Sequence, residues 1–287
     1  MNKFLIRGLR KTGLLKRINF GFKKTINKQK YYIPILSGNG QQNAMRHEEW
    51  MGEVLQLVIS LKSGAFIDVG ANVGQTLLKV KSVDPNILYY GFEPHPTCIY
   101  YLNELIEHNR IGYANLFPVA VSDEPGIARL NFYYDSDTDS AASIIPDFKL
   151  SGDVLKTVFI PCFPMDYFQE FIDSSKVGTV KIDVEGAELE VLKGVKSFLI
   201  KSRPYIIVEV LPVYNEKNNV RLQRQTEIET ILRENEYCIV RILKTSDNHL
   251  ASFECINTIG IHSVQEWCDY IFCPNESVHH FINYTAK

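Results

Sequence analysis

The sequence predicts an α/β protein with a mostly parallel central sheet and helices on both faces. From Phe66 onward, short apolar runs with strand character alternate with amphipathic stretches at helical spacing. A turn with two glycines, within Phe66–Gly74, joins the first of these strands to the next helix. The composition of the 287 residues is ordinary for a globular protein, with 45% hydrophobic and 22% charged residues. This length allows one large domain, or a domain with an appendage.

The region before the first sheet strand divides into an arm and a helix. Residues 1–30 mix cations with Leu and Ile at roughly helical spacing, which predicts a basic helical arm. A connection that contains Pro and Gly follows over residues 33–42, and the apolar stripe of Glu48–Leu61 predicts a helix. We therefore expect an N-terminal arm over residues 1–47 and a second domain over residues 48–287.

The second domain alternates strands and helices in order. The expected strands are Phe66–Val69, Ile87–Phe92, Leu116–Val121, Val180–Val184, Tyr205–Val210, Tyr237–Leu243 and Tyr270–Cys273. The expected helices are Gln75–Ser82, Pro96–Asn109, Met165–Ile172, Ala187–Leu192 and Arg221–Asn235. An insertion over residues 129–160 interrupts the alternation with a predicted hairpin, whose strands are Leu130–Tyr134 and Val158–Ile160 and whose loop includes Asp135–Ser140. The last two strands lack a crossover helix, so we expect a closing antiparallel pair.

Composition excludes several classes of protein. The six cysteines form no C-x-x-C pair, which argues against a zinc ribbon and against a disulfide framework. No run of eighteen apolar residues exists, so no transmembrane helix is expected. Arg7, Arg10 and Lys11 interrupt any signal-peptide core. We therefore expect a cytoplasmic protein with reduced cysteines.

Charge is distributed unevenly along the chain. The first 47 residues hold eleven basic residues and no acidic one, while the remainder holds 20 of the 31 basic residues and all 33 acidic residues. A basic amphipathic arm suits an anionic membrane surface, which predicts peripheral contact through residues 1–30 at the inner face of the membrane. A nucleic-acid contact and a solvated arm that packs on the acidic body remain alternatives. Of these partners, nucleic acid is not expected.

The turn after the first strand is typical of a site for a nucleotide-like cofactor. Gly70 and Gly74 tolerate positive φ and let the backbone approach a ligand closely. The first N–H groups of the following helix lack partners within the helix and point toward the turn. Asp68 places a carboxylate at this turn, which favours a cofactor with a positively charged group over a pyrophosphate. Asn72 stands where a dinucleotide-binding fingerprint has its second glycine, which weakens a nicotinamide interpretation.

Acidic residues follow several strands at the point where each strand ends. Glu93 lies at the end of the second strand, nineteen residues after Gly74, where an acid can accept both ribose hydroxyls of an adenosine. Asp183, Glu185 and Glu209 follow the later strands. Because the carboxyl ends of parallel strands meet at one edge of a sheet, the sequence predicts a ligand site at this edge.

An ordered set of motifs gives a specific resemblance. The motifs are Phe66–Gly74, Gly91–Pro94, Val119–Gly126, Val180–Glu188, Val191–Gly194 and Pro204–Glu209. Together they resemble the FkbM family of S-adenosylmethionine-dependent methyltransferases, over about residues 60–275. The resemblance implies a class I methyltransferase (Rossmann-like) fold, with a seven-stranded sheet whose last strand is antiparallel. It also implies O-methyl transfer, often to a sugar or polyketide hydroxyl.

The resemblance implies roles for individual residues on the cofactor side. Glu93 corresponds to the acid that binds the ribose. Asp183 faces the methionine end of the cofactor and the acceptor. The remaining implied contacts are with the cofactor turn at Asp68, Gly70, Asn72 and Gly74, and with the adenine at Ala120, Val121 and Ser122.

Methyl transfer to a hydroxyl requires alignment of the acceptor and removal of its proton. The candidate catalytic residues are Asp183, Glu185, Glu209 and His95, since clustered carboxylates raise one another's pKa toward a useful range. The same carboxylates have a second interpretation as ligands of Mg²⁺. Helix capping is a third interpretation for Glu185, and packing or capping for His95.

The sequence supports three functional hypotheses. The first is an S-adenosylmethionine-dependent O-methyltransferase that acts on a sugar, a polysaccharide or a glycolipid hydroxyl. The second is an NAD(P)-dependent oxidoreductase on a Rossmann sheet, and Asn72 and the absence of a Tyr-x-x-x-Lys pair argue against it. The third is a non-catalytic binding module, and the acids at the strand ends argue against it.

Overall fold

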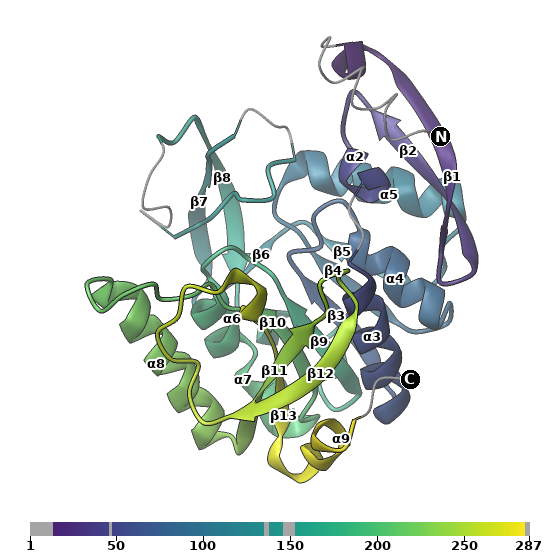
Figure 1. The fold of residues 1–287 in the computed structure, drawn as a ribbon. Helices are drawn as coiled ribbons and strands as arrows, with labels where there is room; N and C mark the ends of the chain where they lie inside the picture. The colour runs from purple at the N-terminus through teal and green to yellow at the C-terminus, as the bar shows by residue number, and fades with distance from the viewer. Residues whose placement is uncertain (1–13, 46–47, 135–137, 146–152, 285–287) are drawn as a thin grey trace.

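A computed structural model describes residues 14–45, 48–134, 138–145 and 153–284 of the chain. Its centre is an eight-stranded sheet with the strand order β12-β11-β13-β10-β9-β3-β4-β5 (Figure 1). The strands are β3 (Ala65–Val69), β4 (Tyr89–Phe92), β5 (Ala114–Phe117), β9 (Val177–Ile182), β10 (Tyr205–Glu209), β11 (Tyr237–Lys244), β12 (Leu250–Ile256) and β13 (Asp269–Pro274). The neighbouring pairs from β5 to β10 are parallel, and β13 is antiparallel to both β10 and β11. The mostly parallel sheet with an antiparallel last strand is therefore confirmed.

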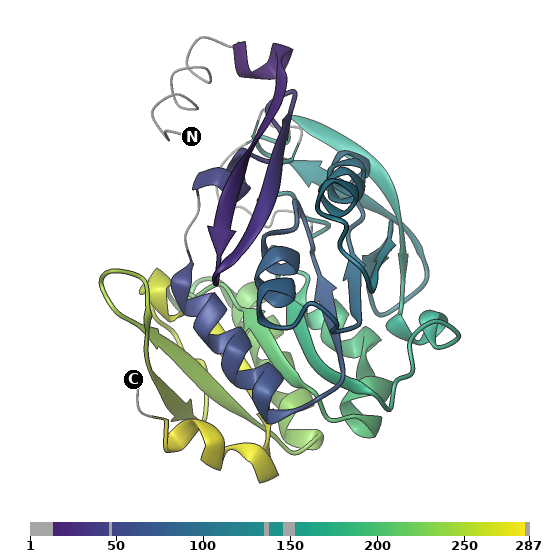
Figure 2. The same ribbon diagram turned by 90° about the vertical axis from the view of Figure 1, so that its right-hand side faces the viewer.

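Helices cover both faces of the sheet (Figures 1 and 2). The α-helices of the described residues are α2 (Gln41–Met45), which contacts β2, and α3 (Glu49–Leu61), α4 (Gln75–Val83), α5 (Pro96–Asn109), α6 (Glu188–Gly194), α7 (Lys196–Lys201), α8 (Asn219–Glu234) and α9 (His279–Ile282). One apolar cluster joins the sheet to α6, α7 and α8, and a second joins the opposite face to α3, α4 and α5. The sheet is therefore buried on both sides, which explains why its central strands are continuously apolar.

The prediction of seven strands is wrong by one edge strand. β12 pairs antiparallel with β11 and is largely half-buried or exposed, so its sequence lacks the apolar run that marks the central strands. The predicted strand Leu116–Val121 is also two strands. Pro118 has no N–H to donate, and the chain leaves the main sheet there, so that β5 ends at Phe117 and β6 (Ala120–Val121) joins a separate sheet.

Two predicted helices differ from the structure. Met165–Ile172 forms only a short 3₁₀ helix over Met165–Phe168, followed by turns. The arm is not helical over residues 19–36, where β1 (Asn19–Ile26) and β2 (Gln29–Leu36) form an antiparallel hairpin (Figure 2). A 3₁₀ helix over Leu14–Arg17 precedes this hairpin.

Local turn chemistry explains the hairpin. Asn27 and Lys28 both have positive φ, as a two-residue turn between antiparallel strands requires. Tyr31 and Ile33 alternate toward the protein and pack against Leu78 of α4 and Tyr101 of α5. The period is therefore two rather than 3.6, and tertiary packing selects it. The predicted helical arm also covers residues 1–13, which lie outside the described residues.

A three-stranded sheet that includes both ends of the insertion lies beside the main sheet. β7 (Gly126–Phe132) pairs antiparallel with β8 (Lys156–Phe163), and β6 pairs parallel with β8. The predicted strands Leu130–Tyr134 and Val158–Ile160 overlap β7 and β8, but β7 begins earlier and ends at Phe132, and β8 is longer at both ends. Across the parts of the chain that the structure describes, no helix is both long enough and apolar enough to cross a membrane.

Candidate active site

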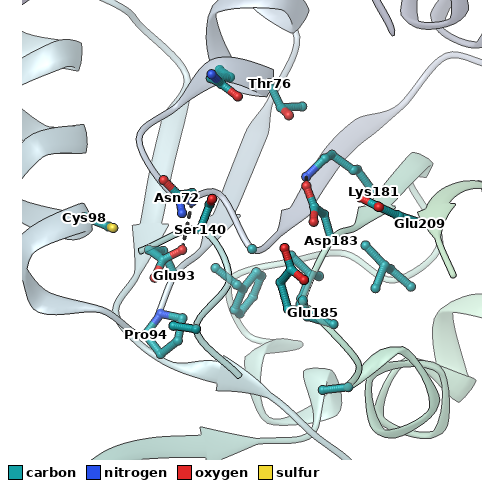
Figure 3. Close-up of a pocket in the computed structure, with 18 of the residues that line it drawn as sticks. Asn72, Thr76, Glu93, Pro94, Cys98, Ser140, Lys181, Asp183, Glu185 and Glu209 are labelled. Carbon is teal, nitrogen blue, oxygen red and sulfur yellow. Dashed lines mark hydrogen bonds and ion pairs between the residues drawn. The ribbon is translucent and has the colours of Figure 1, made fainter. Parts of the chain in front are cut away.

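A pocket lies at the carboxyl ends of β3, β4, β9 and β10 (Figure 3). The strand order changes direction between β3 and β9, and open α/β sheets bind ligands at such a switch point. Predicted site residues that line the pocket are Gly70, Asn72, Glu93, His95, Ala120, Val121, Asp183, Glu185 and Glu209. Asp68, Gly74 and Ser122 are not among its lining residues. The edge of the sheet thus brings together nine of the twelve residues.

The turn after β3 needs glycine at both predicted positions. Gly70 has φ +85°, and a Cβ atom there would stand 1.9 Å from the carbonyl oxygen of Asp183. Gly74 has φ +78° and caps α4, and a Cβ atom there would stand 2.8 Å from side-chain atoms of Leu102 and Leu105. Gly70 therefore lets the turn approach the end of β9, whereas Gly74 lets α4 pack against α5.

Glu93 ties the end of β4 to this turn. Its two carboxylate oxygens accept the backbone N–H groups of Asn72 and His95, each at 2.8 Å. Burial raises the pKa of Glu93 to about 7, although both N–H donors act to lower the pKa. The side chain still lines the pocket, and each of its oxygens has a further lone pair for a ligand hydroxyl.

Asp68 lies beneath the pocket. Its side chain is fully buried, accepts the hydroxyl of Tyr89 at 2.6 Å and lies 3.3 Å from Nζ of Lys181. Asp68 is therefore linked to the pocket through its ion pair with Lys181, and its charge also acts to raise the pKa of Glu93.

Lys181 is a charged pocket residue that sequence reasoning missed. Its Nζ lies 3.1 Å from Oδ2 of Asp183 and its side chain is 6% exposed, so it links the carboxylates of Asp68 and Asp183. Burial lowers the pKa of Lys181, but the two carboxylates outweigh burial and raise the pKa above its usual value. A lysine in the otherwise uncharged, fully buried strand Val177–Ile182 was the signal that could have identified it.

The far end of the pocket is acidic. Figure 3 shows Asp183, Glu185 and Glu209 together on one side, with Glu93 across the pocket beside the turn. Burial, followed by the charges of Asp183, Asp269, Glu185 and Glu188, raises the pKa of Glu209 to about 9. Glu188 accepts the N–H of Gly186 at 2.7 Å, so its role in the structure is local capping.

His95 and Ser122 have local structural contacts. Nδ1 of His95 accepts the N–H of Thr97 at 3.2 Å and caps α5, and the ring packs edge-on against Phe132. The hydroxyl of Ser122 donates to Asp123. His95 still lines the pocket, so its predicted catalytic role stays a prediction.

The insertion forms the roof of the pocket. Asp139, Ser140, Ala142 and Ile144 of this segment, which we call the roof, line the pocket. The carboxylate of Asp139 accepts three backbone N–H groups, from Tyr133, Tyr134 and Ala141, at 2.9 to 3.0 Å.

Two long-range hydrogen bonds hold this roof in place. The Ser143 hydroxyl donates to the carbonyl of Glu185 at 2.6 Å, and Nε2 of Gln42 donates to Oγ1 of Thr138 at 3.1 Å. The insertion and the N-terminal region together cover the site.

The structure does not support the prediction of Mg²⁺. Within the described ranges, no group of three or more His, Cys, Asp or Glu side chains has an arrangement that could hold a metal ion. Asp183 and Asp269 are instead ion-paired with Lys181 and Lys244.

Comparison with known proteins gives a family match. Residues 68–239 match the model of the methyltransferase FkbM domain. The chain is 29% identical over 164 residues to 31-O-demethyl-FK506 methyltransferase FkbM of Streptomyces tacrolimicus, which covers 48% of this chain and 62% of that protein. It is 28% identical over 190 residues to hexuronic acid methyltransferase AglP of Haloferax volcanii, which covers 61% of this chain and 69% of that protein.

A solved structure is also similar. Methyltransferase FkbM from Methylobacillus flagellatus KT aligns with a TM-score of 0.45 and 16% identity, over 73% of this chain and 43% of that chain.

Proposed function

Because this chain belongs to the FkbM methyltransferase family, we propose that it transfers the methyl group of S-adenosylmethionine to a hydroxyl group. One observation supports the proposal most directly. The pocket has a carboxylate suited to a ribose, Glu93, at the glycine turn, and a group of carboxylates suited to proton transfer at its other end. The chain spans 62% of the first relative, so the activity of the whole protein is part of the proposal.

The residues present fit this cofactor. The N-cap of α4 is Gly74, which has no side chain to accept the first N–H groups of the helix. Gln75 and Thr76 of this first turn line the pocket, so the N-terminal end of α4 suits a carboxylate. Glu93 suits the ribose hydroxyls, and Asp183 suits an ammonium group. When bound, the cofactor supplies a methyl group on a positively charged sulfur.

The chain's own residues would orient the acceptor and exclude water. The roof segment that includes Asp139 and Ser140 covers the pocket, and Val69, Phe92 and Ile182 give it apolar walls. Glu209 would accept the proton of the acceptor hydroxyl.

The proposed acceptor is a sugar, polysaccharide or glycolipid hydroxyl. Gln42, Glu48 and Ser140 line the pocket and offer hydrogen-bonding groups of the kind that a polyol requires, and Trp50 also lines it. By their names, the two relatives methylate 31-O-demethyl-FK506 and a hexuronic acid, and the second of these is a sugar acid. Lys23, Lys28 and Lys30 are exposed on the hairpin, which suits the proposed contact between residues 1–30 and an anionic membrane.

Binding measurements test the donor part of the proposal. Thermal shift and isothermal titration calorimetry should show binding of S-adenosylmethionine and S-adenosylhomocysteine, and no binding of NAD⁺ or NADP⁺. Glu93→Gln should weaken both by about tenfold to a hundredfold, because a hydrogen bond to a charged group is worth about 1.5–3 kcal/mol. Glu107→Gln, an exposed position on α5, is the matched control and should leave binding unchanged.

An activity assay then tests the acceptor part of the proposal. Donor with a labelled methyl group is incubated with glycosides of neutral, amino and uronic sugars, and the label transferred to each is measured. A labelled methyl ether would support the proposal. Binding of a nicotinamide cofactor in place of S-adenosylmethionine would favour an oxidoreductase, and binding of neither cofactor would favour a non-catalytic module.

A further inference from the structure

Glu209 differs from the other carboxylates of the pocket in lacking a partner. Within the described residues, no hydrogen bond or ion pair reaches its side chain, although it is the last residue of β10 and lines the pocket. Asp183 and Asp269 are paired with Lys181 and Lys244. Glu93 and Asp139 accept backbone N–H groups. Glu209 therefore has a free hydrogen-bonding carboxyl group inside the site.

The charged groups around Glu209 come from several elements at this end of the pocket. They are Lys181 on β9, Asp183 and Glu185 on the loop that follows it, Glu188 on α6, Asp269 on β13 and Lys244 on β11. Asp269 lies directly opposite Glu209 in the antiparallel register. Burial raises the pKa of the neighbouring Cys268 thiol to about 12, so this thiol is neutral. Both lysines are already paired with aspartates, so carboxylates outnumber free cations around Glu209.

The ligand-free site consequently favours a neutral Glu209. Burial and the four surrounding carboxylates raise its pKa to about 9, above the pH at which an ordinary glutamate ionises. A neutral carboxyl cannot take a proton from an acceptor hydroxyl, so a base at this position needs a change that ionises it first.

We propose that the protonation state of Glu209 depends on the charge of the methyl donor. The carboxyl group is protonated without ligand, ionises when the cationic donor binds, and regains a proton from the acceptor hydroxyl. This inference rests on the proposed function. As the acceptor oxygen gains the methyl group, its proton moves to the Glu209 carboxylate. The donor sulfur keeps the electron pair of its broken bond to carbon and becomes neutral. Charge, atoms and electrons balance, and no other base is required.

The donor and its product form a matched pair of probes. S-adenosylmethionine has a positively charged sulfur, and S-adenosylhomocysteine has a neutral one at the same position. An opposite charge within about 4–6 Å lowers a carboxyl pKa by about 1–3 units. From a pKa of about 9, this shift releases between about 0.2 and 0.9 of a proton at about pH 7.5.

Calorimetric titration of the full chain in buffers with different ionisation enthalpies measures this proton count without any acceptor. We expect wild-type protein to release more protons with S-adenosylmethionine than with S-adenosylhomocysteine, by the amount above. Glu209→Gln should remove this excess. Glu188→Gln, also a buried glutamate, and Glu227→Gln, an exposed one, should retain it. Comparison between proteins cancels any titration of the ligands themselves.

Several results would overturn the inference. These are equal proton counts for the two ligands in wild-type protein, an excess that persists in Glu209→Gln, or an excess that only Glu188→Gln removes. Should Glu209→Gln fail to fold, the same calorimetric comparison of the two ligands is made on wild-type protein over a series of pH values. The excess proton release must fall toward zero by about pH 5, where the carboxyl group stays protonated with either ligand, and an excess that persists there would overturn the inference. Failure of both ligands to bind refutes the proposed function itself, which is a distinguishable outcome.

Discussion

Replacement of Lys181 by methionine should destabilise the protein strongly. Lys181 lies 3.3 Å from the fully buried carboxylate of Asp68, and Asp183 on its other side is 42% exposed. Methionine keeps most of the side-chain volume, so the variant removes a charge without opening a large cavity. Removing one partner of a buried ion pair costs about 3–5 kcal/mol, because the remaining charge is left without compensation. Asp68 would keep only the Tyr89 hydroxyl as a partner, so we expect a loss in this range.

Urea unfolding followed by circular dichroism measures this loss, with free energies taken by linear extrapolation. The double variant Asp68→Asn with Lys181→Met should be more stable than Lys181→Met alone, since neutral side chains in place of a buried pair are often tolerated. Lys176→Met is the matched control. Lys176 is 78% exposed and paired with Asp173 at 3.0 Å, so its replacement should cost at most about 1 kcal/mol.

Two results would refute this reasoning. One is a cost below about 1 kcal/mol for Lys181→Met, which would mean that water or a backbone shift compensates Asp68. The other is a double variant no more stable than the single one, which would place the cost in packing rather than in charge.

Three further predictions concern the turn, the acidic end and the roof of the pocket. Gly70→Ala should cost at least about 2 kcal/mol in thermal unfolding, since left-handed backbone alone costs about 1–2 kcal/mol and the new Cβ would overlap a carbonyl; Gly112→Ala, in open space, should be neutral. Because the folded state raises the pKa of Glu209 from 4.5 to about 9, stability is full below the lower value and falls as pH rises toward the higher one. Glu209→Gln should therefore flatten the decline in the free energy of unfolding, measured by urea titration between about pH 5 and 9, by at most about 1.4 kcal/mol per pH unit, and an unchanged slope would contradict this. Asp139→Ala should leave three backbone N–H groups without their partner and speed limited proteolysis between residues 133 and 144, with wild-type cleavage rates as the opposing result.

Much of the candidate site could be predicted because it lies at the ends of parallel strands. Such strands end at one edge of the sheet, so Glu93, Asp183 and Glu209 converge whatever the details of packing. The positive φ of Gly70 and Gly74 likewise follows from local sequence, since a sharp turn between a strand and a helix requires it. These features depend on the order of residues along short segments.

Direction of side chains could not be predicted in the same way. Asp68 belongs to the expected motif, yet the pleat of β3 turns it beneath the pocket, toward Tyr89 and Lys181 on neighbouring strands. The pairing depends on the register of β3 against β9, where Asp68 lies opposite Lys181. A single sequence carries no direct information on that register.

The sequence by itself determined the alternating sheet, the glycine turn, the family and the acidic edge, because each follows from local patterns and strand direction. Only the tertiary structure decided the hairpin over residues 19–36, the roof of the pocket and the pairing of Lys181. These features depend on contacts between distant segments, such as Gln42 with Thr138 and Ser143 with Glu185. Helical spacing in the arm competed with burial of Tyr31 and Ile33 against α4 and α5, and burial prevailed because apolar packing outweighs local propensity.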